Sequence, residues 1–152
     1  VIYDAERGPQ MLSNAELTYD YRSSALKTRS DRRFVVLQAN FILPKDDPTA
    51  IKERMAEFNA YRKRTQPPGA SLGSIFKNPT GDYAGRLIEV CGLKGHRIGN
   101  AQVSPKHANF FVNIGDACAS DYYALIQHVQ AVVHQREEVW LEPEIELIGV
   151  WN

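Results

Sequence analysis

Cysteine is scarce in this sequence, where Cys91 and Cys118 are the only two among 152 residues. Two cysteines cannot build a disulfide framework, and without a C-x-x-C spacing they do not match a zinc site. Both stand beside small or apolar neighbours, which is typical of buried, inert thiols in a reducing compartment. We therefore expect neither a disulfide scaffold nor a metal centre.

An excess of charge of either sign is also lacking, because eighteen Lys and Arg residues balance eighteen Asp and Glu residues. Binding to a nucleic-acid backbone rests on an excess of cations, so a net charge of zero argues against nucleic acid as a partner. The basic run at residues 62–64 fits the solvated face of a helix.

Long hydrophobic runs are absent as well. No window approaches the ~18 consecutive apolar residues of a membrane-spanning helix, so we expect no membrane span. The N-terminus lacks the basic segment followed by an apolar one that marks a secretory signal. The chain begins at Val1, inside the apolar run VIY, which suggests a processed or excised fragment.

Strand-like patterns occur in both halves of the chain. Residues 1–8 have the pattern of a strand and a turn, and residues 34–43 (FVVLQANFIL) are rich in β-branched and aromatic residues. Residues 108–115 (ANFFVNIG) have the composition of a buried strand. Residues 144–151 (EIELIGVW) alternate as a last strand after a proline.

A helix is expected to begin at Pro48, with Asp47 as its N-cap, and to end before the QPPGAS stretch. Its apolar stripe consists of Ile51, Met55 and Phe58. We place the domain boundary just before this helix, at residues 44–47. The two domains would then be residues 1–43 and residues 44–152.

Two more helices are expected in the second half. One spans residues 83–90 with Gly92 as its C-cap, and a longer one is capped by Ala119 or Ser120. The longer helix has a wide apolar stripe of Leu125, Ile126, Val129, Val132 and Val133. Strands mixed with separated helices predict an α+β fold.

The stretch SLGSIFKNPTGD, residues 71–82, has no helical or strand periodicity beyond one short apolar pair. A proline and a glycine close it into a bend that carries Ser74, Lys77 and Asn78. These polar groups either bind something outside the chain or form a tight turn.

Several residues could carry chemistry. Ser74, His107 and Glu144 would allow a hydrolase triad, but LGSIF lacks the G-x-S-x-G elbow and no strand is expected before it. The guanidinium of Arg22 suits bidentate capture of a carboxylate or phosphate, or Arg22 is a surface residue on a turn. Lys77 likewise could meet a phosphate or only solvent.

Four sequence blocks resemble a known family. LGSIFKNPTGDYAGRLIE, GLKGHRIGNAQVSPKHANFFVN and WLEPEIELIG are similar to the C-terminal half of the UDP-N-acetylenolpyruvoylglucosamine reductase (MurB) family. ELTYDYRSSALK resembles the Y-R-x-S segment that closes the family's flavin-binding part. The short link before GSIFKNP resembles the compact, type II-like branch of the family.

The resemblance implies an enzyme of peptidoglycan synthesis in the bacterial cytoplasm. With FAD and NADPH, the family reduces an enolpyruvyl ether on a UDP-sugar to a lactyl ether, making UDP-N-acetylmuramate. Residues 1–43 would be the β-rich tail of the FAD-binding domain. Residues 44–152 would be the substrate-binding domain, with a mixed sheet and helices.

Carried over position by position, the resemblance implies three catalytic residues. Ser74 would donate a proton, Glu144 would lie near the substrate carboxylate, and Arg22 would steady the developing enolate and contact the cofactor. The implied substrate contacts are Asn78, Lys77, His107 and Tyr21. For Lys77, pairing with the diphosphate and ordering of the bend both stay open, and His107 also suits a structural role.

The family's glycine segment for the flavin pyrophosphate has no counterpart in this sequence. We therefore expect the chain alone to bind FAD poorly and to be inactive without the N-terminal flavin-binding half of the enzyme. The expected partners are that half and the UDP-sugar, with no nucleic acid and no membrane. The alternative is a non-catalytic UDP-sugar-binding module that lacks the flavin half.

Overall fold

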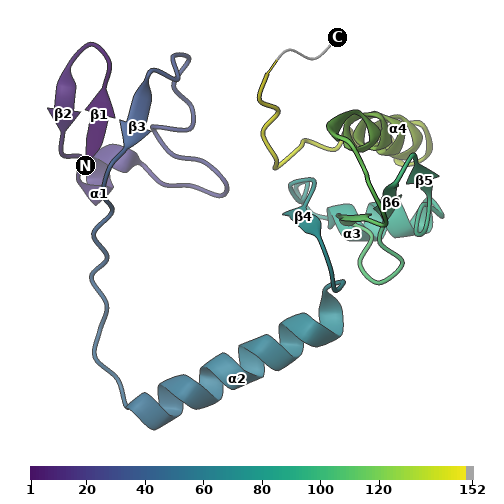
Figure 1. The fold of residues 1–152 in the computed structure, drawn as a ribbon, viewed down its shortest axis with the longest axis horizontal. Coiled ribbons are helices and arrows are strands. Elements are labelled where there is room, and N and C mark those ends of the chain that lie inside the picture. Colours follow the sequence, from purple (N-terminus) through teal and green to yellow (C-terminus); the bar gives the residue numbers. More distant parts are fainter. Residues whose placement is uncertain (150–152) are drawn as a thin grey trace. The chain divides into compact units, whose positions relative to one another are not determined.

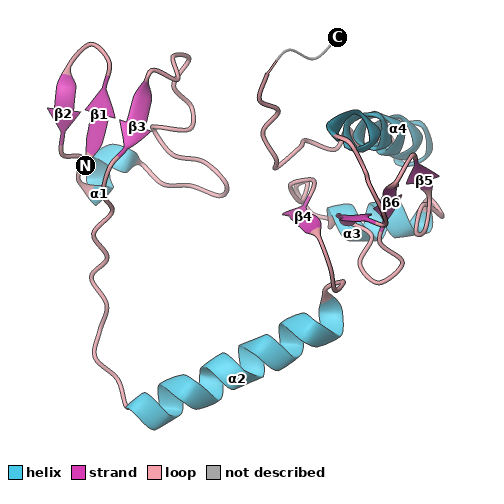
Figure 2. Cartoon of the chain, in the orientation of Figure 1, coloured by secondary structure: helices cyan, strands magenta, loops and turns pink. Residues whose placement is uncertain are grey.

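The computed structural model describes residues 1–149, which form two compact units divided between Asp47 and Pro48. Figures 1 and 2 show the helices and strands of each unit. The first unit combines one helix with a sheet and the second several helices with a sheet, so the expected α+β class is confirmed, although all the described strand pairs are antiparallel. The assignment of residues 1–43 and 44–152 to a flavin-binding and a substrate-binding domain stays a prediction.

The first unit is built on a three-stranded sheet. Its strands lie in the order β2 (Gly8–Gln10), β1 (Ile2–Asp4), β3 (Phe34–Val36), and the short helix α1 (Asn14–Leu17) follows β2. The buried carboxylate of Asp4 accepts hydrogen bonds from the amides of Glu6 and Arg7, at 2.9 and 3.0 Å. These bonds close the turn between β1 and β2, so the expected strand and turn are confirmed.

The strand expected over residues 34–43 is wrong beyond its first three residues. Pairing with β1 ends at Val36, whose partner is Ile2. The next two amides both donate to the carbonyl of Val1, whose ammonium group donates to the carbonyl of Gln38 at 2.7 Å, and no further strand follows in this run among the described residues. A β-prone run becomes a strand only where a partner edge continues. The apolar side chains beyond β3 are exposed, including Leu37, Phe41, Ile42 and Leu43.

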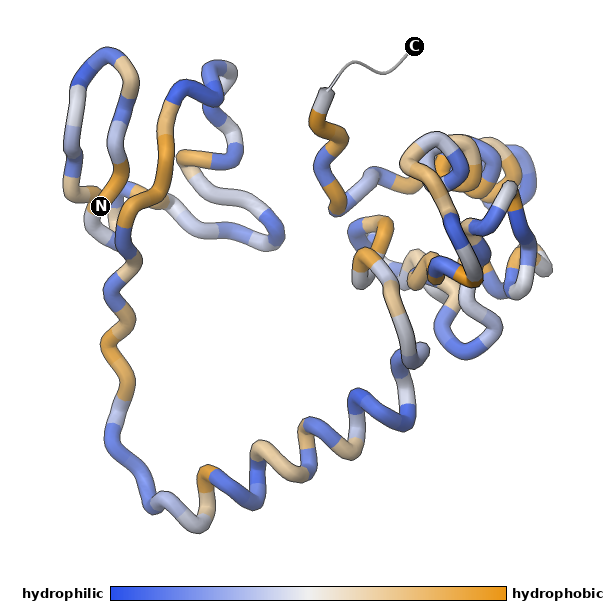
Figure 3. Tube along the Cα trace, in the orientation of Figure 1, coloured by the Kyte–Doolittle hydropathy of each residue, from blue (hydrophilic) through white to orange (hydrophobic). Residues whose placement is uncertain are grey.

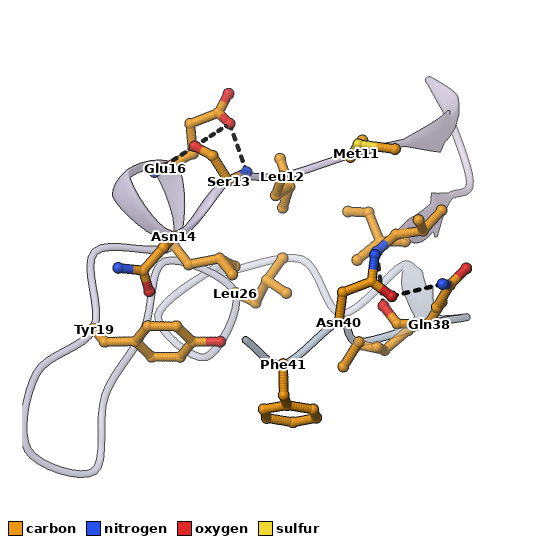
Figure 4. Close-up of a pocket in the computed structure, with 15 residues that line it drawn as sticks. Met11, Leu12, Ser13, Asn14, Glu16, Tyr19, Leu26, Gln38, Asn40 and Phe41 are labelled. Carbon is orange, nitrogen blue, oxygen red and sulfur yellow. Dashed lines mark hydrogen bonds between the residues drawn. The ribbon is translucent and has the colours of Figure 1, made fainter. Parts of the chain in front are cut away.

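A cavity of about 700 Å³ lies beside α1 and the segment after β3 in the first unit (Figure 4). Much of its wall is apolar, formed by side chains that include Met11, Leu12, Leu17, Leu26 and Phe41. Figure 3 shows the hydrophobic stretch of trace that follows β3. No other part of residues 1–47 covers this apolar surface.

The second unit has a four-stranded sheet with helices packed against it. The strand order is β4 (Ser71–Ser74), β7 (Phe110–Asn113), β6 (Ala101–Val103), β5 (Arg97–Ile98). Helices α3 (Ala84–Val90) and α4 (Ala119–Glu137) contact each other, and α4 also contacts β5 and β6. The core between them includes Ile75, Phe76, Leu87, Ile88, Val103, Phe111, Leu125, Ile126, Val129, Val133 and Leu141.

The second expected helix and the stripe of the third are confirmed. Gly92 follows the C-cap of α3 with φ +71°, a left-handed conformation that glycine adopts without strain. In α4, four stripe residues are buried and Val132 packs partly buried against them. The buried four are Leu125, Ile126, Val129 and Val133. The strand expected over residues 108–115 is present as the shorter β7.

The start of α4 differs from the expectation. Cys118 holds the N-cap position instead of Ala119 or Ser120, and the Asp121 carboxylate accepts from the Cys118 amide at 3.2 Å. This carboxylate satisfies one free amide at the helix start, the amide of the N-cap residue itself. The side chain of Cys118 is exposed, contrary to the expectation of two buried thiols, whereas Cys91 is buried.

The first expected helix is present as α2 (Pro48–Thr65), with Pro48 at its first position. Capping by Asp47 stays a prediction. The apolar stripe of α2 is not buried, since Ile51, Met55 and Phe58 are 38, 58 and 62 % exposed. Figure 3 shows apolar and polar residues alternating along this helix. Neither α2 nor any other described helix is long and apolar enough to cross a membrane.

The last strand expected at residues 144–151 is absent over residues 144–149, and the rest of it lies outside the described residues. One isolated bridge joins Phe76 to Pro143. Antiparallel continuation from this bridge would place the later residues opposite β4. That strand is bulged, with Gly73 at φ +78°, and a bulge interrupts the ladder that further pairing needs.

A glycine at the turn between β5 and β6 gives a test of the fold. Gly99 has φ +55°, and a Cβ atom there would overlap the carboxylate of Asp121. That carboxylate accepts from the amides of Asn100 and Cys118, both at 3.2 Å. We expect Gly99→Ala to lower the free energy of unfolding by about 2–4 kcal/mol, measured by urea denaturation, because the strain of the positive φ adds to the loss of these hydrogen bonds.

Gly92→Ala is the matched control for this prediction. Gly92 also has a positive φ, but a Cβ atom there meets nothing within 4 Å. Its replacement therefore costs only backbone strain, about 1–2 kcal/mol. An equal loss of stability in the two variants would contradict a role for the contact with Asp121.

Candidate functional site

Ser74 is the last residue of β4, so the polar bend begins at the end of a strand. β4 pairs with β7 through Ser71–Val112 and Ser74–Phe110, with a bulge between the two pairs. The expectation that residues 71–82 hold no strand, and that none precedes Ser74, is therefore wrong. Pairing with β7, rather than a pattern in the sequence, makes this segment a strand. The next helix begins only at Ala84, so no hydrolase-type elbow forms at the serine.

Asn109 bonds to the two residues that follow Ser74. Its main-chain carbonyl accepts from the amide of Ile75 at 2.9 Å. Its side chain, in a residue only 4 % exposed, accepts from the amide of Phe76 through Oδ1 at 2.9 Å. The same side chain donates to the carbonyl of Phe76 through Nδ2 at 2.8 Å. The peptide groups next to the serine are thereby satisfied in a buried place.

Residues 142–144 bond to the same segment from elsewhere in the chain. The amide of Glu144 donates to the carbonyl of Ile75 at 2.7 Å, and the amide of Lys77 donates to the carbonyl of Glu142 at 2.9 Å. This pairing brings two sequence-predicted residues together, because Ser74 directly precedes the residue that Glu144 bonds to. Both Ser74 and Glu144 are half-buried.

A cavity of about 460 Å³ lies against Ser74, α3 and the segment before β7. It brings together three expected site residues, Ser74, Asn78 and His107. Lys77 and Glu144 are not among the residues that line it. The remaining wall is formed by Tyr83, Gly85, Arg86, Glu89, Lys106, Ala108 and Asn109.

Asn78 and Lys77 both have partners that order the bend. The side-chain oxygen of Asn78 accepts from the amide of Ala84 at 3.1 Å, which satisfies one free amide at the start of α3. The ammonium group of Lys77 forms an ion pair with the carboxylate of Glu142. A substrate contact for either residue stays a prediction.

The imidazole of His107 is half-buried beside the cavity. Burial lowers the pKa of His107, which favours the neutral ring at pH 7. Its Nδ1 accepts from the amide of Asn109 at 3.3 Å, so Nε2 carries the proton and can donate to a ligand. Phe110 packs edge-on against the ring with a centroid separation of 4.9 Å. Gly85 lies so close that a Cβ atom there would be 3.2 Å from the ring.

Cationic groups also stand at this cavity. Arg86 bonds to Asp82 through Nε at 2.7 Å, and this bond is the main reason that the pKa of Asp82 falls to about 2. The ammonium group of Lys106 donates to the carbonyl of Lys63, at the C-terminal end of α2. A carbonyl does not neutralise an ammonium charge, so the cavity can attract an anionic ligand.

Tyr21 and Arg22 belong to the first unit. They lie in an exposed turn closed by the bridge between Asp20 and Ser23, and Arg22 has φ +54°. The guanidinium carbon of Arg22 is 5.6 Å from the centre of the Tyr21 ring. The roles expected for both residues stay predictions.

Sequence reasoning missed several residues of this site. The most important of these is Asn109. The only hint in the sequence is that a polar residue interrupts an apolar run, directly before β7. Arg86, Tyr83 and Lys106 line the cavity but had no motif of their own. Among residues 1–149, no group of three or more potential metal ligands occurs.

Comparison with known proteins gives consistent matches. The model of the family described as UDP-N-acetylenolpyruvoylglucosamine reductase, C-terminal domain, matches residues 64–148. The UDP-N-acetylenolpyruvoylglucosamine reductase of Exiguobacterium sibiricum is 45 % identical over 139 residues, covering 91 % of this chain and 45 % of that protein. The Listeria innocua reductase is 46 % identical over 139 residues, covering 91 % and 46 %.

A solved structure is also similar. The crystal structure of UDP-N-acetylenolpyruvylglucosamine reductase (MurB) from Thermus caldophilus matches with a TM-score of 0.73 at 42 % sequence identity. The match covers 87 % of this chain and 46 % of that chain, and the chain spans about half the length of its curated relatives. Because the family model covers more than half of the chain, the chain belongs to the UDP-N-acetylenolpyruvoylglucosamine reductase family and contains its C-terminal domain.

Proposed function

We propose that this chain supplies the substrate-binding and proton-donating part of a UDP-N-acetylenolpyruvoylglucosamine reductase. The reaction converts the enolpyruvyl ether of a UDP-sugar to a lactyl ether, yielding UDP-N-acetylmuramate. One observation carries the proposal: backbone pairing joins residues 75–77 to residues 142–144, so that Glu144 bonds to the residue directly after Ser74, and Ser74 lines a cavity.

The proposed chemistry follows from the charge that develops in the substrate. Addition of hydride to the terminal carbon places negative charge on the neighbouring carbon and its carboxylate. A proton donor must then stand over that carbon, and we assign this role to the hydroxyl of Ser74. Glu144 lies near the substrate carboxylate in this proposal. Hydrogen-bond donors around the cavity hold the ligand while charge builds up.

His107 and Asn78 are the proposed contacts to the sugar nucleotide within the cavity. The neutral ring of His107 offers an Nε2 proton to the ligand, as its Nδ1 already accepts from a main-chain amide. The ammonium group of Lys106 adds positive charge at the same cavity, which suits a diphosphate, whereas the charge of Arg86 is already paired with Asp82. Lys77 contributes either to the diphosphate or to the order of the bend. Tyr21 is proposed as a further substrate contact from the first unit.

The residues of this chain fit FAD only in part. Arg22 is a cation in an exposed turn and can meet an anionic group of the cofactor or of the substrate. The described helix of the first unit, α1, has its N-terminus taken by a capping box of Ser13 and Glu16. No helix N-terminus among residues 1–47 is therefore left for a pyrophosphate.

We infer that FAD is held mainly by a flavin-binding half that lies outside this chain. FAD reduced by NADPH supplies the hydride, and this chain's residues bind the substrate and deliver the proton. The flavin-binding half and the UDP-sugar are the proposed partners. Peptidoglycan synthesis places the proposed enzyme in the bacterial cytoplasm.

The inference about FAD predicts weak flavin binding by the 152-residue chain. After incubation with excess FAD and removal of free cofactor, the chain should retain far less than one flavin per molecule, read from visible absorbance. The full-length protein that carries this sequence is the control, and it should retain one. A full equivalent of FAD on the 152-residue chain would contradict the inference.

The role of Ser74 predicts a selective loss of activity. In the full-length protein, Ser74→Ala should slow substrate reduction by roughly 10²- to 10⁴-fold, because the positioned proton donor is removed. Reduction of the flavin by NADPH should be unchanged, and stopped-flow absorbance separates the two steps. Ser71→Ala, at the other end of β4, is the matched control and should leave both steps intact.

Two outcomes would count against this assignment. Substrate turnover within a few-fold of the wild type in Ser74→Ala would remove the proton donor from the proposal. A full-length protein that binds the UDP-sugar but reduces neither flavin nor substrate would support the alternative, a non-catalytic UDP-sugar-binding module.

A further inference from the structure

Asn109 acts as a strand partner for the residues that follow Ser74. The ladder between β4 and β7 ends at the pair Ser74–Phe110. Beyond it, the main chain and side chain of Asn109 together bond to the amide of Ile75 and to both peptide groups of Phe76. A primary amide can do this because it carries an acceptor and a donor side by side, like a peptide group.

These bonds set the direction in which the chain leaves Ser74. The pair with Phe110 holds Ser74 on one side, and the Asn109 bonds hold the next two residues. Phe76 is 1 % exposed and packs edge-on against Phe111, with ring centroids 6.1 Å apart. The backbone of Ser74 and of the two residues after it is therefore held along one strand edge.

Asn109 also holds a second residue of the cavity. Its amide donates to Nδ1 of His107 at 3.3 Å. Asn109 is therefore hydrogen-bonded both to His107 and to the residues directly after Ser74. Ser74 and His107 line the same cavity from different segments. Displacement of Asn109 would shift the proposed proton donor and a proposed substrate contact relative to each other.

We propose that Asn109 is a positioning residue, which holds the Ser74 hydroxyl at the point where it delivers its proton. The proposal rests on the proposed function of Ser74. Asn109 touches no reacting atom in it, and the effect of its side chain passes through the backbone of Phe76, whose amide and carbonyl it bonds. Catalysis is sensitive to such placement, because a shift of about 1 Å can cost roughly a hundredfold in rate.

Asn109→Leu in the full-length protein is the first test. Leucine has a similar size but cannot bond to Phe76, so kcat for substrate reduction should fall by about tenfold to a hundredfold. Flavin reduction by NADPH and the KM for NADPH should stay within a few-fold. Asn113→Leu is the matched control, since Asn113 ends the same strand and accepts from the amides of Gly115 and Ala117.

A double variant separates positioning from general damage. If Asn109 acts only through Ser74, Ser74→Ala combined with Asn109→Leu should be no slower than Ser74→Ala alone. Multiplicative losses in the double variant would overturn the proposal, as would equal losses of kcat in Asn109→Leu and Asn113→Leu. If Ser74→Ala loses activity and Asn109→Leu does not, only the positioning role fails. If Ser74→Ala stays active, both proposals fail.

Asn109→Asp provides a second test, which remains usable if the leucine variant fails to fold. A protonated aspartic acid can accept from the amide of Phe76 and donate to its carbonyl, as asparagine does, whereas the ionised form cannot donate. Burial next to a carbonyl should raise the pKa of the new carboxyl. The kcat of this variant relative to the wild type should therefore rise as the pH falls from about 8 to about 5.5. A ratio that does not change with pH would overturn the proposal.

Discussion

Hydrogen bonds on both sides of residues 75–77 hold the candidate site together. Asn109 occupies one side of this segment, and residues 142–144 occupy the other. The segment follows directly after Ser74 and leads into the bend, so its position decides where Ser74, Lys77 and Asn78 lie. The same bonds tie the distant Glu144 to this place. Removing a partner from a buried peptide group costs about 1–3 kcal/mol, which makes alternative paths of the chain unfavourable.

Local patterns in the sequence predicted α2, α3 and α4, but not the four-residue helix α1. The proline that starts α2, the glycine after α3 and the apolar stripe of α4 are each recognised within a few residues of sequence. The strand β7 (Phe110–Asn113) was predicted equally well, because its run of residues is mostly apolar. That composition fits its position inside the sheet, between β4 and β6. These elements depend mainly on spacing and composition.

The features that failed depend on partners far away in the chain. Residues 34–43 and 144–151 have strand composition, but pairing of the first run stops after Val36, and residues 144–149 form no strand opposite the bulged β4. For β4 the reverse holds: its sequence has no strand pattern, and only its pairing with β7 makes it a strand. Ser74 was found through the family resemblance, while Asn109 could not be found, because a single asparagine in an apolar run does not reveal which peptide groups it will meet.

The exchange rates of backbone amides would test this account most directly. The described hydrogen bonds predict that the amides of Ile75, Phe76, Lys77 and Glu144 exchange with solvent as slowly as those of β7, measured by NMR on the chain in deuterated water. Slow exchange at all four would show that the segment is held on both sides. Exchange at these positions as fast as in the exposed residues 41–43 would contradict the central claim.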